Sequence, residues 1–173
     1  MQAWCTVQRI AAALLCFRWS KRFIWTLIVS DCQFIKGEPV MIYETSLVTR
    51  FCESDAMGHI SNVSYFIYCE AARVNFLTEL NISKVDETWD FVVASIKCDF
   101  LKQMYPHQKI TILTQVLRIG NKSISLQHQL QSEDGEILAV VQEVLVRFNR
   151  GSQSTQLLNQ SMIDKLRLYE MTQ

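Results

Sequence analysis

The sequence predicts an α+β fold in which an antiparallel sheet wraps around one mostly buried helix. Residues 62–80 contain no glycine or proline and carry apolar side chains at helical spacing. Four strand-like segments follow, separated by short turn sequences. Because helix and sheet must each bury an apolar face, wrapping the sheet round the helix is the simplest arrangement.

Each element has its own signal. Residues 42–51 alternate loosely and are rich in β-branched side chains, which indicates a first strand. In the helix, one apolar stripe consists of Val63, Phe66, Ile67, Ala71, Val74 and Leu77, and a second of Tyr65, Tyr68, Cys69, Ala72 and Phe76. Two stripes cover more of the circumference than a surface helix needs, so we expect burial on most sides. Glu70 and Arg73 stand three residues apart and can pair.

The second half of the chain reads as strands over 91–101, 109–119, 123–131 and 136–148. The third alternates most clearly, with Ile124, Leu126, His128 and Leu130 on one face. "IGNKS" and "SEDGE" are typical of hairpin turns, so we expect consecutive strands to pair as a meander. Residues 154–170 have amphipathic spacing and predict a terminal helix.

Composition excludes several classes of function. The chain has 173 residues, enough for one ordinary domain, and a formal net charge of +0 without a long basic stripe, which argues against a nucleic-acid binder. Its six cysteines form no CxxC pair and no Cys/His group at zinc spacing, so we expect reduced thiols, no bound metal and a cytoplasmic location. The apolar runs near the N-terminus are too short to span a bilayer, so no stable membrane insertion is expected.

Residues 1–40 differ from the rest. They hold 5 basic and 2 acidic residues, against 12 and 15 from Met41 onward. A signal peptide, a transit-like peptide and an extension outside the functional domain all fit this pattern, and we favour the extension. "KGEP" at 36–39 punctuates the boundary, which predicts an extension over 1–40, a domain over 41–150 and a helical tail over 151–173.

The stretch "SDAMGHISN" gathers Asp55, Gly58, His59 and Asn62 just before the predicted helix. Amides at a helix N-terminus stabilise developing negative charge by about 3 kcal/mol per donor. Gly58 lets the chain turn close to a ligand. We expect the amides of His59 and Ile60, or of their neighbours, to face a substrate oxygen, with Asp55 opposite as general base or nucleophile and no cofactor required.

Each of these residues also has a purely structural interpretation. Asp55 could cap the loop or the helix entry, and His59 could pack at a dimer seam. Asn62 could be the helix cap, a water-positioning amide, or both. Tyr65 is a possible substrate contact, although a tyrosine at this spacing is more often part of a core.

The run "RFCESDAMGHISNVSYFIYCEAAR", followed by "GNKSISL" and "DGEILAVVQEVLVRF", resembles the 4-hydroxybenzoyl-CoA thioesterase family of hotdog-fold acyl-CoA thioesterases. The resemblance covers residues 41–150 and implies hydrolysis of an acyl-CoA thioester. It also implies a homodimer as the minimal unit, with active sites at its interface, which could pair into a homotetramer. The acid matching Asp55 would attack the carbonyl or activate a water. The chain departs from many relatives at Ser61, where they have asparagine.

The phosphates of CoA need cations or backbone donors. Lys122 and Ser123, with Arg118 behind them, are the best candidates, and an exposed hairpin charge is the alternative interpretation. Two other functions stay open: a hotdog enoyl-CoA hydratase, and a non-catalytic acyl-CoA or acyl-carrier binding module. The acyl group, and CoA or acyl carrier protein as donor, are not fixed by the sequence.

Overall fold

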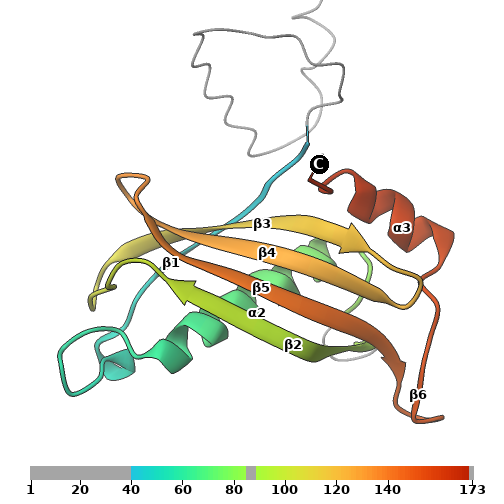
Figure 1. The fold of residues 1–173 in the computed structure, drawn as a ribbon, viewed down its shortest axis with the longest axis horizontal. Coiled ribbons are helices and arrows are strands. Elements are labelled where there is room, and N and C mark those ends of the chain that lie inside the picture. Colours follow the sequence, from blue (N-terminus) through green and yellow to red (C-terminus); the bar gives the residue numbers. More distant parts are fainter. Residues whose placement is uncertain (1–39, 85–88, 172–173) are drawn as a thin grey trace, which may run out of the picture. The chain divides into compact units, whose positions relative to one another are not determined.

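The computed structural model describes residues 40–84 and 89–171 (Figure 1). The strands are β1 (Tyr43–Val48), β2 (Phe91–Phe100), β3 (Lys109–Ile119), β4 (Ser123–Ser132), β5 (Ile137–Asn149) and β6 (Ser154–Thr155). The helices are a short 3₁₀ turn, η1 (Phe51–Glu53), the long α2 (Asn62–Glu79) and α3 (Gln160–Arg167). The predicted extension over 1–40 lies, apart from Val40, outside the described residues.

The sheet has the order β1-β3-β4-β5-β2, with β6 added to β5, and every strand pair is antiparallel. The predicted meander is confirmed for β3, β4 and β5. It is wrong for β2, which pairs with β5 from Phe91↔Arg147 to Phe100↔Ala139. Strand β1 occupies the free side of β3, so β2 takes the opposite end of the sheet. The outer edge of β2 has no strand partner among the described residues.

Helix α2 lies across one face of this sheet (Figure 1). The stripe that contains Tyr65, Tyr68, Cys69, Ala72 and Phe76 is buried, as predicted. The other stripe is covered only in part, because Val63 is 64% exposed and Ile67 46% exposed. One sheet can cover only one side of a helix, so the single chain leaves an apolar flank of α2 in solvent.

A chain of buried polar side chains ties α2 to the middle of the sheet. Thr114 Oγ1 lies 2.9 Å from His128 Nδ1, and His128 Nε2 lies 2.9 Å from Glu143 Oε1. Arg73 on α2 donates to Glu143 Oε2 at 2.5 Å. The expected contact with Glu70 is present at 3.6 Å, but the buried partner of Arg73 is Glu143. Because a buried charge without a partner is costly, these contacts fix the position of α2 on β3, β4 and β5.

The predicted terminal helix over 154–170 is shorter in the structure. Ser154 and Thr155 pair with β5, and helix α3 begins only after Asn159, whose Oδ1 accepts a hydrogen bond from Met162 N at 2.9 Å. This asparagine is an N-cap inside a pattern that spacing alone reads as continuous helix. Over the described residues, no helix is long and apolar enough to cross a bilayer.

Candidate functional site

The loop between η1 and α2 is folded around the Asp55 side chain. Asp55 Oδ1 accepts hydrogen bonds from Met57 N at 2.8 Å and from His59 N at 3.3 Å. Gly58 has φ +80, and no heavy atom lies within 4 Å of the position its Cβ would take. Glycine is therefore favoured here by the backbone conformation and not by lack of space. The loop-capping interpretation of Asp55 is confirmed, and the carboxylate is held in a defined place.

Glu53 anchors this loop to helix α2. Its buried carboxylate accepts hydrogen bonds from Tyr68 Oη at 2.5 Å, Arg50 N at 2.7 Å and Arg50 Nη2 at 2.6 Å. Its backbone oxygen accepts one from Ser61 N at 2.9 Å. Burial alone would raise the pKa of Glu53, but the hydrogen bonds from Arg50 and Tyr68 outweigh burial and hold that pKa below its ordinary value.

A cleft of about 390 Å³ brings most of the predicted site residues together. One wall carries Asp55, Met57, His59, Ile60, Asn62 and Tyr65, and the other is the segment Phe100–Gln103 at the end of β2. The ring of Tyr65 meets the ring of Phe100 edge to face at 4.9 Å, so the tyrosine is both core and cleft lining. The cleft thus joins the helix entry to the end of β2.

The amides expected to face a substrate oxygen are engaged elsewhere. Ile60 N donates to Met104 O at 2.8 Å, and His59 N donates to Asp55. The N-cap position is held by Ser61, so Asn62 is the first helical residue and not the cap. Asn62 N and Val63 N make no hydrogen bond within the described part of the chain. The free donors at this helix N-terminus are therefore one turn further along than predicted.

His59 packs against a residue that sequence reasoning did not identify. Its ring meets that of Tyr105 edge to face, with centroids 5.2 Å apart. His59 N is bound to Asp55, so the ring and the carboxylate belong to one hydrogen-bonded turn. A direct role of the imidazole in chemistry stays a prediction.

The predicted CoA contacts lie at the other end of the sheet. Lys122 Nζ donates to Thr155 Oγ1 at 3.1 Å, Ser123 is paired with Val146, and Arg118 is exposed. This hairpin borders the core cluster around Phe76, whereas the cleft borders the cluster around Tyr65. Within one chain these three residues do not line the cleft, and their contact with CoA stays a prediction.

Sequence reasoning missed the second wall of the cleft and the anchor beneath the loop. Phe100 and Lys102 could not be placed opposite Asp55, because the expected meander put β2 beside β3. Glu53 had one usable signal, since an acid at this position can bond back to the backbone three residues earlier. Across residues 40–84 and 89–171, no group of three or more His, Cys, Asp or Glu side chains could hold a metal ion.

Comparison with known proteins identifies a family. A family model described as the thioesterase-like superfamily matches residues 49–166. The chain is 29% identical over 122 residues to the uncharacterized protein YsmA of Bacillus subtilis, which covers 70% of this chain and 83% of the relative. It is 34% identical over 64 residues to the acyl-CoA thioesterase YbgC of Helicobacter pylori, covering 37% of this chain and 48% of that protein.

Solved structures agree with the predicted architecture. A predicted thioesterase from Bacillus stearothermophilus superposes with a TM-score of 0.71 at 26% identity, over 77% of this chain and 99% of the other. The expected α+β hotdog fold is confirmed by this likeness together with the family match.

Replacing Glu53 by Gln removes the ionised acceptor beneath the loop, and we expect it to lower the free energy of unfolding at pH 7 by about 1–3 kcal/mol. Because the pKa of Glu53 is lowered in the folded chain, its contribution is complete above the ordinary value of 4.5 and is lost as the pH falls through the lowered value. Urea unfolding at a series of pH values should show the two chains converging below pH 4.5. The matched control is Glu44→Gln, which changes an exposed glutamate on β1. A Glu53→Gln difference no larger than that of the control would contradict the anchoring role.

Proposed function

The chain belongs to the thioesterase-like superfamily, and from this membership and the geometry of the cleft we propose that it hydrolyses an acyl-CoA thioester to a free acid and CoA. The main support for the proposal is that Asp55 and Asn62, the first residue of α2, line the same cleft. Within the superfamily we propose, from the motif, that the chain is one of the 4-hydroxybenzoyl-CoA thioesterases. The free thiols of Cys52, Cys69 and Cys98 fit a cytoplasmic enzyme.

The thioester carbonyl would lie at the N-terminus of α2. Attack turns its oxygen into an oxyanion, which Asn62 N and Val63 N can stabilise together with the helix dipole. Both donors are fixed before substrate arrives, because the helix holds their direction. Backbone donors of this chain would therefore meet the developing charge.

Asp55 would supply the nucleophile or the base. Its Oδ1 is occupied by two amides, whereas Oδ2 accepts no hydrogen bond from the described residues. Oδ2 either attacks the carbonyl carbon, giving an acyl anhydride that water then opens, or takes a proton from the attacking water. In both routes the carbon–sulfur bond breaks, the sulfur leaves as a thiolate and is protonated to the CoA thiol, and the acid retains an oxygen from water.

The minimal unit of the proposed enzyme is a homodimer formed through β2. The outer edge of this strand is unpaired in the described chain, and Val93, Ile96 and Phe100 are 43%, 39% and 45% exposed. In an antiparallel pairing of β2 with a second copy, Lys97 of one strand can face Asp99 of the other. A second copy would also cover the apolar flank of α2, so the same face would lose both its open edge and its exposed apolar groups. Two such dimers could pair into a homotetramer.

Replacing Asp55 by Asn preserves the acceptor of the turn and removes the charge, so turnover should fall about 100-fold or more while the fold is kept. Thiol release from a panel of short, long and aromatic acyl-CoAs measures the turnover, with Asp134→Asn in an exposed hairpin turn as control.

Crotonyl-CoA tests the hydratase alternative, because a hydratase adds water without releasing thiol. Tight acyl-CoA binding without thiol release by the unaltered protein would identify a binding module instead.

Asn62→Pro tests the amide donor itself. Proline is tolerated at the first helical position, and Ser61 already has ψ 143, which suits a residue before proline. The variant should keep α2 but lose one oxyanion donor, with kcat lower by about 100- to 1,000-fold. Asn62→Ala, which keeps the amide, is the matched control and separates the backbone donor from the side chain. Equal rates for the two variants would remove Asn62 N from the mechanism.

The dimer is tested by Ile96→Lys, which places a cation in the centre of the β2 edge. Sedimentation should give the unaltered protein about twice its chain mass of 20.1 kDa and the variant the chain mass alone. Val48→Lys changes an exposed apolar residue on the opposite edge strand and should stay dimeric. A dimeric Ile96→Lys variant would show that β2 is not the interface.

A further inference from the structure

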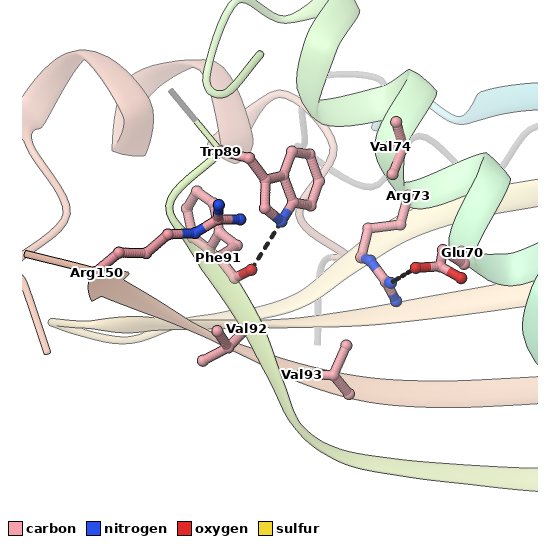
Figure 2. Close-up of a pocket in the computed structure, with 8 residues that line it drawn as sticks. All are labelled: Glu70, Arg73, Val74, Trp89, Phe91, Val92, Val93 and Arg150. Atoms are coloured by element: carbon pink, nitrogen blue, oxygen red, sulfur yellow. Dashed lines mark hydrogen bonds and ion pairs between the residues drawn. The ribbon is translucent and has the colours of Figure 1, made fainter. Parts of the chain in front are cut away.

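A second pocket lies along the same flank of α2 as the cleft, at the other end of β2. It measures about 400 Å³ and is lined by Glu70, Arg73, Val74, Trp89, Phe91, Val92, Val93 and Arg150. Figure 2 shows Arg150 and Trp89 on one side and Arg73 with Glu70 on the other, with Val92 and Val93 between them on β2. The walls are apolar and aromatic, whereas the polar groups stand at opposite sides.

Two arginines in this pocket have side-chain nitrogens without a partner among the described residues. Arg73 is 6% exposed, and its Nε is buried without an acceptor. The side chain of Arg150 forms no ion pair in the described part of the chain, whereas the indole nitrogen of Trp89 is bound to Phe91 O at 2.8 Å. Arg73 Nε has almost no exposed surface, so the unpaired donors that a ligand with an acceptor group can reach are those of the exposed Arg150.

The charges around the pocket indicate what kind of acceptor fits. The one lining carboxylate, Glu70, lies 3.6 Å from Arg73 Nη2, and the Nη1 of Arg73 is bound to Glu143. These ion pairs leave Arg150 as the uncompensated cation among the residues that line the pocket. A carboxylate can accept from Arg150, and charge-assisted bonds of this kind are the stronger ones.

Within one chain the pocket is too far from the cleft to bind part of a substrate held there. Val93 in the pocket and Phe100 in the cleft are separated by seven steps of extended strand, roughly 23 Å at the usual rise per residue. Pairing of β2 with a second copy changes this. With the midpoint of β2 on the twofold axis, Val93 lies opposite residue 98 of the partner subunit, and with the axis at Cys98 it lies opposite residue 103. In both registers the pocket of one copy adjoins the cleft of the other.

We infer that this pocket binds the far end of the acyl group of a thioester held at Asp55 of the partner subunit, and that it selects acyl groups ending in a carboxylate, with Arg150 as the specificity-determining residue. The inference rests on the proposed thioesterase function and dimer. The apolar walls would hold the methylene chain, and Arg150 would bind the terminal carboxylate.

The test compares carboxylate-ended with neutral acyl-CoAs of matched length: succinyl with butyryl, glutaryl with pentanoyl, adipyl with hexanoyl. For at least one length the unaltered protein should prefer the carboxylate-ended substrate in kcat/KM. Arg150→Gln should lower that preference about tenfold, through a lower kcat/KM for the carboxylate-ended substrate. Arg167→Gln, an exposed arginine on α3, is the matched control. No preference in the unaltered protein, or a preference kept by Arg150→Gln, overturns the inference.

A mixed dimer tests whether the pocket acts across the interface. One copy carries Asp55→Asn and the other Arg150→Gln, each with its own affinity tag for isolation of the mixed species. The working cleft then belongs to the Arg150→Gln copy and the intact pocket to its partner, so the preference of the unaltered protein should return. The low preference of Arg150→Gln would show that the pocket acts within one chain and overturn the inference. If the unaltered protein releases no thiol from any of these substrates, the proposed function on which the inference rests is refuted instead.

Discussion

The first turn of α2 contains backbone amides that the helix itself cannot satisfy, and the rest of the candidate site depends on where those amides point. In this chain Asn62 lines the cleft, and Asn62 N and Val63 N make no hydrogen bond within the described residues, whereas Ser61 N is bound to Glu53 O and Ile60 N to Met104 O. The amides that precede the helix are thus hydrogen-bonded, and those of the first two residues of α2 stay free of partners among the described residues. The same loop holds the Asp55 carboxylate, so Asp55 and the amides proposed as oxyanion donors are joined by one hydrogen-bonded segment.

The second wall of the cleft comes from the sheet. Because β2 pairs with β5 and not with β3, its end returns to the N-terminus of α2 and closes the second wall of the cleft with Phe100 and Lys102. The same displacement leaves β2 as an edge strand with exposed apolar side chains. A buried polar chain from Thr114 to Arg73 holds α2 in place on the sheet, so the cleft and the open edge keep a fixed relation.

Local patterns predicted the elements well, because strand alternation and helical spacing reflect burial directly. The faces of β4 and the extent of α2 follow from Ile124, Leu126 and Tyr65 and their neighbours without knowledge of the tertiary fold. Pairing of β2 could not be predicted, since a strand with apolar residues on both faces fits beside either β3 or β5. The engagement of Ile60 N within the chain could not be predicted, because its hydrogen bond to Met104 O joins segments that are distant in sequence. The start of α3 could not be predicted either, because its N-cap, Asn159, lies inside a longer segment of amphipathic spacing.

The most direct test of the account is a crystal structure with a ketone analogue of an acyl-CoA, in which a methylene group replaces the thioester sulfur and prevents cleavage. The account predicts that the ketone oxygen lies about 3 Å from Asn62 N or Val63 N, with the carboxylate of Asp55 facing the carbonyl carbon. A ketone oxygen bound by other groups, with the first turn of α2 still facing solvent, would contradict it.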